Sequence, residues 1–144
     1  MNQCNADEVA KACAEAMYER DVAARELGIT LVKIRQAYAC LKMKVREDML
    51  NGHNICHGGF IFALADTAFA YACNSYNKAT VALNCDIDFV QAGRMNDELI
   101  ATAEERQREG RTGVYDVVVN RSDGSVLAHF RGRSYQIQGE VLKK

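Results

Sequence analysis

The first third of the chain changes from a helical to an alternating pattern of apolar residues. Residues 6–26 are rich in Ala, Glu and Arg and place apolar side chains three or four positions apart. This spacing predicts one amphipathic helix, capped by Gly28. Residues 29–45 alternate between apolar and polar positions in two stretches, which predicts an antiparallel pair of strands.

The most apolar segment lies in the middle of the chain. Residues 60–73 are rich in Ala and Leu and follow the pair Gly58 and Gly59, which predicts a buried helix. The segment is too short, and with Asp66 too charged, to span a membrane. A helix that is apolar on almost every side needs cover on almost every side. We therefore expect a sheet of the same chain to cover one flank and a partner subunit to cover the rest.

The last part of the chain has the pattern of consecutive strands. Strand-like runs occupy residues 79–90, 97–107, 112–121 and 125–137, and residues 120–124 are typical of a hairpin turn. Two helices and about six strands joined by short turns predict an α+β fold with an antiparallel sheet. A length of 144 residues suits one domain, which we expect to span residues 1–144.

Composition narrows the classes of function. The formal net charge of −1 gives no broad attraction for nucleic acid or for an anionic membrane surface, so neither is an expected partner. The first thirty residues lack the apolar run of a secretory signal, which favours a cytoplasmic protein. The six cysteines lack the close pairs of zinc ribbons and redox sites. We expect free thiols, no metal and no cofactor.

The densest run of reactive side chains is residues 51–66, NGHNICHGGFIFALAD. Gly58 and Gly59 lie where the helix should begin. Unpaired N–H groups there, helped by the helix dipole, can bind an anion or a carbonyl oxygen that becomes one. A missing Cβ also lets a ligand approach the backbone closely. The alternative is that the two glycines only permit a tight turn into the helix.

Asp66 is the second signal, because a carboxylate inside an apolar helix loses hydration when it is buried. Burial would raise its pKa, and a carboxylate held in this way can act as a general base or a nucleophile. The alternative is a structural Asp66 that is hydrogen-bonded to nearby backbone or to Thr67.

Helix geometry separates these two signals within one chain. The eight residues from Gly58 to Asp66 span about 12 Å along a helix axis, too far for both groups to touch one reacting carbonyl. Two such helices packed antiparallel across a two-fold axis would bring Asp66 of one subunit toward the glycine turn of the other. A dimer would then hold two equivalent sites.

Other polar residues near this segment have two interpretations each. His57 could orient the turn or the substrate, and Asn51 could position a water or a carbonyl, although both types are also common as structural residues. A nucleophilic pair of Cys56 and His57, or a metal site that uses the two histidines of the segment, is disfavoured by their spacing. Arg106, Arg108 and Arg111 suit a phosphate-bearing substrate, or else form a solvated charged turn.

At these residues the chain resembles the hotdog-fold acyl-CoA thioesterases, and specifically the phenylacetate-degradation thioesterase (PaaI-type) group. The resemblance extends over nearly the whole length. It is carried by ACAEAMYERDVAARELGI near the start, DMLNGHNICHGGFIFALADTAFAYACNS in the middle, CDIDF, and TGVYDVVV and FRGRS toward the end. It implies a long central helix wrapped by an antiparallel sheet, paired subunits, and usually a tetramer of two dimers.

The resemblance also implies roles for particular residues. Asp66 would be the catalytic carboxylate, and the Gly58 N–H would polarise the thioester carbonyl. Residues Asn51, His57 and Gly59 would line the same site, and the turn formed by Arg111, Thr112 and Gly113 would contact coenzyme A. One departure stands at residues 88–93, DFVQAG, where the family often has D-F-L-R-P-G, so a basic contact and a rigid turn are missing.

Together these features predict an acyl-CoA thioesterase that hydrolyses phenylacetyl-CoA or ring-hydroxylated phenylacetyl-CoA without a metal or redox cofactor. Two alternatives remain. A hotdog hydratase or dehydratase usually pairs a histidine with the carboxylate, but no histidine lies between residues 58 and 128. A non-catalytic acyl-CoA-binding module would not depend on the charge of Asp66.

Overall fold

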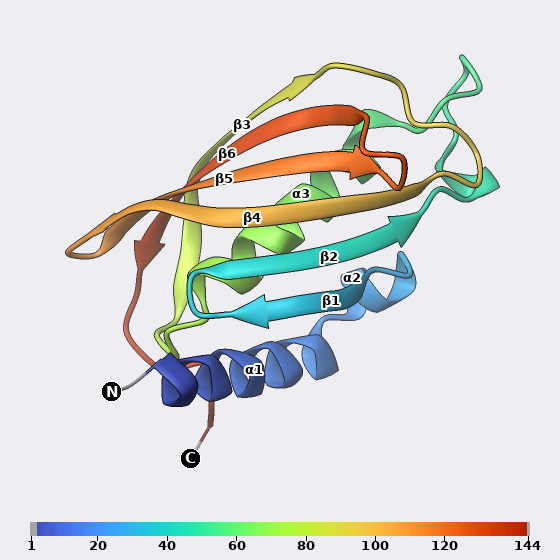
Figure 1. The fold of residues 1–144 in the computed structure, drawn as a ribbon. Coiled ribbons are helices and arrows are strands. Elements are labelled where there is room, and N and C mark those ends of the chain that lie inside the picture. Colours follow the sequence, from blue (N-terminus) through green and yellow to red (C-terminus); the bar gives the residue numbers. More distant parts are fainter. Residues whose placement is uncertain (1–2, 144) are drawn as a thin grey trace.

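One antiparallel sheet wraps around a central helix in the computed structural model, which describes residues 3–143 except the side chain of Cys4 (Figure 1). The spatial order of the strands is β1-β2-β4-β5-β6-β3. Their bounds are β1 Thr30–Arg35, β2 Tyr38–Lys44, β3 Thr80–Phe89, β4 Glu98–Glu109, β5 Thr112–Arg121 and β6 Val126–Gln136. The predicted α+β architecture and the predicted strand runs are confirmed.

The helices are α1 (Gln3–Arg20), α2 (Val22–Glu26) and α3 (Gly58–Cys73), with a short 3-10 turn, η1, at Glu47–Met49. The prediction of one helix over residues 6–26 is wrong, because Asp21 ends α1 and starts α2. Its carboxylate accepts a hydrogen bond from Ala24 N at 3.1 Å, the bond of an N-cap, which favours a break in the helix. Gly28, at φ 71°, lies just beyond the end of α2, as the sequence predicts.

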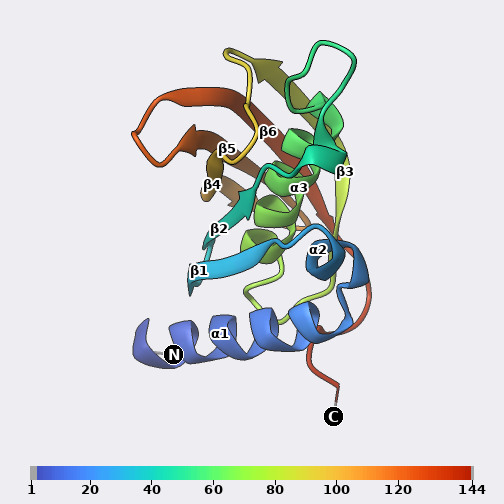
Figure 2. The same cartoon turned by 90° about the vertical axis from the view of Figure 1, so that its right-hand side faces the viewer.

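Helix α3 lies in the concave face of the sheet (Figure 2). Alternate residues of β5, including Tyr115, Val117 and Val119, are buried toward it. Phe69 of α3 contacts the rings of Tyr115 and Phe130, at centroid distances of 5.7 and 5.9 Å. A Cβ on Gly132 would lie 2.7 Å from the Phe69 ring, so a glycine is needed where helix and sheet meet. The hairpin turn predicted at residues 120–124 is present, with Gly124 at φ 91°.

The sheet does not cover all of α3. Half-buried or exposed positions recur every three or four residues along the helix and form one stripe, at Gly59, Phe62, Ala63, Asp66, Thr67 and Ala70. Next to it, β3 is the last strand of the sheet, bonded to β6 on one side only. Val81 and Leu83 on β3 are 45% and 64% exposed. One flank of the helix is therefore covered by the sheet, as predicted.

None of the helices within residues 3–143 is both long enough and apolar enough to cross a bilayer.

Candidate functional site

The start of α3 is shaped by His57, which is the N-cap residue of the helix. Its Nδ1 accepts a hydrogen bond from Gly59 N at 2.9 Å, so the histidine orients the turn. This bond requires an unprotonated Nδ1 and leaves Nε2 to carry the proton. The sequence predicts two unpaired glycine N–H groups at this turn, but the Gly59 N–H is bonded, so only that of Gly58 remains. Within residues 3–143, the N–H of Gly58 donates no hydrogen bond.

Gly58 is needed because an aromatic ring lies against it. A Cβ at this position would be 3.0 Å from Cζ of Phe89, the last residue of β3. The space left by the missing side chain is thus filled by this ring, which is itself 54% exposed. The end of β3 and the start of α3 are in contact, and the Gly58 amide lies at their junction.

Asp66 lies two turns further along α3, in the middle of its uncovered stripe, and is half-buried. In the described part of the chain its carboxylate makes no hydrogen bond and no ion pair. The neighbouring Thr67 hydroxyl donates to Ala63 O at 2.6 Å, so it does not satisfy Asp66. Burial raises the pKa of Asp66 above its usual value. This arrangement speaks against the alternative of a structural, hydrogen-bonded Asp66.

Two thiols accompany this carboxylate. Burial, with the charge of Asp66 as a smaller cause, raises the pKa of Cys73 to about 12 and that of Cys85 to about 11. Both thiols are therefore protonated at neutral pH and are poor nucleophiles. Asp66 therefore remains the candidate reactive group of this part of the helix.

Asn51 belongs to the loop that leads into α3. Its Oδ1 accepts hydrogen bonds from the backbone N–H groups of His53, at 2.9 Å, and Ile55, at 3.4 Å. Asn51 thus has the structural role of a turn residue, while its side-chain NH₂ group makes no hydrogen bond within residues 3–143. That group remains available to a ligand.

Cys56 is a buried structural residue. Burial, followed by the charge of Asp97, raises the pKa of its thiol to about 11. Because the thiolate is the nucleophilic form, this environment opposes the pair of Cys56 and His57 as a nucleophile and base. The five cysteines from Cys13 onward are free thiols, as predicted, while the Cys4 side chain lies outside the described part. No group of three or more His, Cys, Asp or Glu side chains suited to a metal ion occurs among the described residues.

The turn of Arg111, Thr112 and Gly113 lies at the other end of α3. Arg111 and Thr112 share a small cavity with Cys73, the last residue of the helix. Within one chain, the glycine turn, Asn51 and His57 therefore lie together at the start of α3. Asp66 lies about 12 Å further along the helix axis, and the arginine turn lies beyond the end of the helix.

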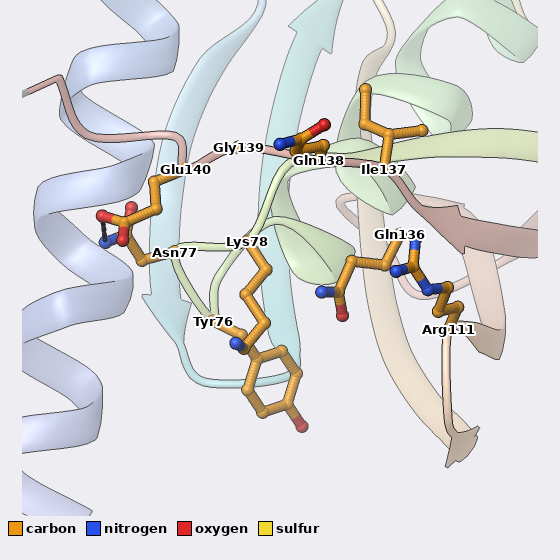
Figure 3. Close-up of a pocket in the computed structure, with 9 residues that line it drawn as sticks. All are labelled: Tyr76, Asn77, Lys78, Arg111, Gln136, Ile137, Gln138, Gly139 and Glu140. Carbon is orange, nitrogen blue, oxygen red and sulfur yellow. Dashed lines mark hydrogen bonds between the residues drawn. The ribbon is translucent and has the colours of Figure 1, made fainter.

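Arg111 also lines an open cavity of about 710 Å³ together with Tyr76, Lys78 and Gln136 (Figure 3). Of the three arginines in this region, Arg106 pairs with Asp116 at 3.0 Å, and Arg108 stacks on the Tyr76 ring at 3.8 Å. Arg111 and Lys78 form no ion pair among the described residues. Sequence reasoning did not single out Lys78, although a lysine in the turn after the apolar helix is a signal for it.

The geometry thus provides a carboxylate of raised pKa and, at a helix start, one amide without a partner among the described residues. It also provides a cavity lined by two cations, Lys78 and Arg111, and one carboxylate, Glu140, which we call the cationic cavity for its excess of positive charge. A family model described as the Thioesterase superfamily matches residues 53–128, which include the glycine turn and Asp66. The chain belongs to this superfamily.

Particular relatives agree with this assignment. The chain is 48% identical to the acyl-coenzyme A thioesterase PaaI of Escherichia coli K12 over 128 residues, which cover 89% of this chain and 91% of the relative. The solved structure of the E. coli PaaI protein, from the phenylacetic acid degradation operon, superposes with a TM-score of 0.92 at 46% identity, covering 93% of this chain and 97% of the other. A mutant of PaaI from Thermus thermophilus gives a TM-score of 0.76 at 33% identity, covering 79% and 97%.

We predict that Asp66→Asn stabilises the protein at neutral pH. A raised pKa means that the folded protein takes up the Asp66 proton at a higher pH than the unfolded chain does, so the ionised carboxylate destabilises the fold above that pKa. The midpoint of thermal unfolding at pH 7 should therefore be higher for Asp66→Asn than for wild type. The difference should narrow as the pH falls toward about 4.

Asp116→Asn is the matched control with the opposite sign. Hydrogen bonds from Arg131 lower the pKa of Asp116. Partial burial opposes this effect, and a hydrogen bond from Arg106 adds to it. Asp116→Asn should therefore lower the unfolding midpoint at pH 7. An Asp66→Asn protein that is less stable than wild type at pH 7 would contradict the description of Asp66 as an unsatisfied charge.

Proposed function

We propose that this protein is an acyl-CoA thioesterase that hydrolyses aryl-acetyl-CoA thioesters, such as phenylacetyl-CoA or its ring-hydroxylated forms, to the free acid and coenzyme A. The observation that carries the proposal is the half-buried Asp66 carboxylate, without a partner among the described residues, on the face of α3 that the sheet leaves open. The superfamily membership and the near full-length likeness to an acyl-CoA thioesterase support the same chemistry.

The reaction uses the two groups on α3 in different roles. The Gly58 N–H donates to the thioester oxygen as negative charge develops there. Asp66 either attacks the thioester carbon, forming an anhydride that water cleaves, or removes a proton from a water that attacks. In both routes the carbon–sulfur bond breaks and the thiol of coenzyme A leaves. Burial raises the pKa of Asp66, which makes it a better base than a hydrated aspartate.

The site forms between two subunits in this proposal. The first half of β3 carries exposed Val81 and Leu83, and its second half carries exposed Asp86 and Asp88. The unpaired backbone groups of this free edge are a template for a further strand. Two-fold pairing of β3 with its copy would place two α3 helices antiparallel with their uncovered stripes facing. Asp66 of one subunit then approaches Gly58 of the partner, which closes the 12 Å gap. We further propose that two such dimers form a tetramer.

Coenzyme A is bound by its charge at the end of α3. Lys78 and Arg111 present two cations to the same cavity, and the phosphate groups of coenzyme A are anions that complement them. Thr112 and Gly113 continue this surface from Arg111 and are proposed to contact the same group. Asn51, His57 and Gly59 line the acyl end of the site, where Nε2 of His57 has no partner among the described residues and can donate to the substrate.

The hydratase alternative has little support in the geometry. His53 and His57 precede α3, and His129 lies opposite Asp88 in the pairing of β3 with β6. Within residues 3–143, none of the three is bonded to Asp66. A carboxylate without a histidine partner suits hydrolysis better than the proton exchange of a dehydration.

We predict that Asp66→Asn lowers kcat for phenylacetyl-CoA by about 10² to 10⁴, because it removes the positioned base or nucleophile. Release of free thiol measures the rate. Single turnover in ¹⁸O-labelled water then separates the two routes, since label in the Asp66 carboxylate reports the anhydride and its absence reports direct attack by water. Turnover at the wild-type rate by folded Asp66→Asn would reject Asp66 as the catalyst, whereas binding of phenylacetyl-CoA by wild type without any release of thiol would favour a binding module.

A second prediction concerns the shared site. Gly58→Pro removes the amide hydrogen at the first helical position, where His57, at ψ 131°, has the backbone conformation that proline accepts after it. Gly58→Pro and Asp66→Asn should each be inactive. Refolded together at equal concentration, they should regain about a quarter of the wild-type rate, because half of the dimers would hold one intact site.

Gly58→Ala is the matched control for this experiment, since it adds the same Cβ beside Phe89 but keeps the N–H. It should retain more activity than Gly58→Pro. If the mixture of the two inactive variants stays inactive although mixed dimers form, the site does not span two subunits.

A third prediction tests the cationic cavity. Arg111→Glu and Lys78→Glu should each raise KM for phenylacetyl-CoA by about tenfold through loss of a charge-assisted contact to phosphate, with little change in kcat. The thioester of phenylacetate with N-acetylcysteamine lacks phosphates, so its hydrolysis should be unaffected. Lys44→Glu, at an exposed lysine outside this cavity, is the control. Equal effects on both substrates would place the coenzyme A phosphates elsewhere.

A further inference from the structure

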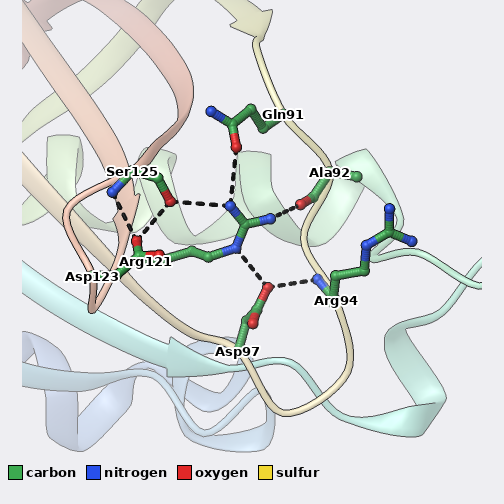
Figure 4. Close-up of polar contacts among 7 residues, drawn as sticks. All are labelled: Gln91, Ala92, Arg94, Asp97, Arg121, Asp123 and Ser125. Carbon is green, nitrogen blue, oxygen red and sulfur yellow. Dashed lines mark hydrogen bonds and ion pairs between the residues drawn. The ribbon is translucent and has the colours of Figure 1, made fainter.

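Arg121, the last residue of β5, ties together the loop between β3 and β4 (Figure 4). Its Nε donates to Asp97 Oδ2 at 2.9 Å, and one terminal nitrogen donates to Gln91 Oε1 at 3.1 Å and to Ser125 Oγ at 3.0 Å. The other terminal nitrogen donates to the backbone oxygen of Ala92. One guanidinium group thus fixes both ends of residues 91–97, and its side chain is only 21% exposed.

This loop is in direct contact with the start of α3. Gly93, next to Ala92, accepts a hydrogen bond from Cys56 N at 2.8 Å. The contact is close, because a Cβ on Gly93 would lie 3.1 Å from Cβ of Cys56. Cys56 is two residues before Gly58, whose amide is the proposed donor to the substrate. The chain of contacts therefore runs from Arg121 through Ala92 and Gly93 to the glycine turn.

A second residue next to this loop, Phe89, also contacts the glycine turn. Phe89 immediately precedes the loop, and its ring lies against Gly58. The next residue, Val90, donates its N–H to Leu127 O at 2.7 Å, which anchors the chain to β6. The far end of the loop is held as well, since Asp97 accepts from Arg94 N at 2.8 Å and its backbone oxygen accepts from Val45 N at 2.9 Å.

Within the described part of the chain, no bond of Arg121 reaches Asp66 or the residues of the proposed site directly. Arg121 also binds both residues at which this chain departs from the family pattern, namely the side chain of Gln91 and the backbone carbonyl of Ala92. The side-chain contact that joins both ends of this loop comes from a guanidinium group supplied by another strand.

We propose that Arg121 is a positioning residue for thioester hydrolysis, which holds the loop of residues 91–97 against Cys56 and thereby fixes the direction of the Gly58 N–H. This inference rests on the proposed function. A displacement of about 1 Å in a group that contacts the reacting atoms is enough to slow a reaction about 100-fold. Loss of Arg121 therefore affects the transition state more than it affects substrate binding, which depends on the distant cationic cavity.

The test compares Arg121→Met and Arg121→Lys with wild type. Arg121→Met should lower kcat for phenylacetyl-CoA by about 10- to 100-fold and change KM less than about threefold, at a temperature well below its unfolding midpoint. Arg121→Lys keeps a cation beside Asp97 but loses the two terminal guanidinium nitrogens that reach Ala92 and Gln91. Its kcat should therefore lie between those of wild type and Arg121→Met. Arg131→Gln is the control. It removes another hydrogen-bonded arginine, paired with Asp116 at 2.6 Å on the outer face and more exposed than Arg121, and should leave kcat unchanged.

A second measurement does not depend on activity. The chain has ten glycines, so labelling with ¹⁵N-glycine gives a simple amide spectrum. The Gly58, Gly59 and Gly93 signals should shift, and the amide of Gly59 should exchange faster, in Arg121→Met but not in Arg131→Gln. Unchanged glycine signals together with a wild-type kcat in Arg121→Met would overturn the inference. A loss of kcat that occurs only because Arg121→Met unfolds would also overturn the inference.

The two proposals fail separately in these experiments. If wild type releases no thiol from phenylacetyl-CoA, the proposed function fails, while the glycine signals still decide whether Arg121 sets the turn. If Asp66→Asn is inactive and Arg121→Met is fully active, only the role of Arg121 is wrong.

Discussion

The partial burial of Asp66 on an otherwise apolar helix is the constraint on which the rest of the molecule depends. A carboxylate in that position loses hydration and finds no hydrogen bond among the described residues, so its pKa is raised. The sheet covers the opposite flank of α3 with buried side chains such as Tyr115 and Val117, and leaves the stripe that contains Asp66 open. The fold therefore keeps a charged group at a surface that only a substrate or a second subunit can cover.

This arrangement explains why other nearby groups do not compete for the chemistry. Cys56, Cys73 and Cys85 are thiols of raised pKa, since burial disfavours their charged form. His57 uses its Nδ1 to bind the Gly59 amide. These groups are thus either neutral or already bonded, which leaves the carboxylate of Asp66 as the proposed base or nucleophile on the open face of α3.

The direction of the Gly58 N–H depends on contacts made at the start of α3. His57, Phe89 and Gly93 approach the glycine turn from three different segments, and each fixes a separate part of it. The loop that supplies Gly93 is held by the side chain of Arg121 and by backbone hydrogen bonds to Leu127 and Val45. A free amide is useful for catalysis only when its direction is fixed, and here that direction depends on residues far apart in the sequence.

Most helices and strands of this chain can be predicted from its sequence, because periodicity and turn residues are local. The apolar run before Cys73, the alternating strands and the turn ending at Gly124 were all readable in this way. The distance between Gly58 and Asp66 followed from helical rise alone. The break at Asp21 was missed, since a helical pattern continues through it and only the capping bond to Ala24 interrupts the helix.

Only the tertiary structure decided which groups are free. No local pattern shows that His57 takes the Gly59 amide, that Phe89 fills the space beside Gly58, or that Lys78 joins Arg111 in one cavity. These contacts join residues from different strands and loops, so they depend on the register of the sheet and on the path of the chain. For the same physical reason, the roles of Gln91 and Ala92 became clear only when Arg121 was seen to bind them both.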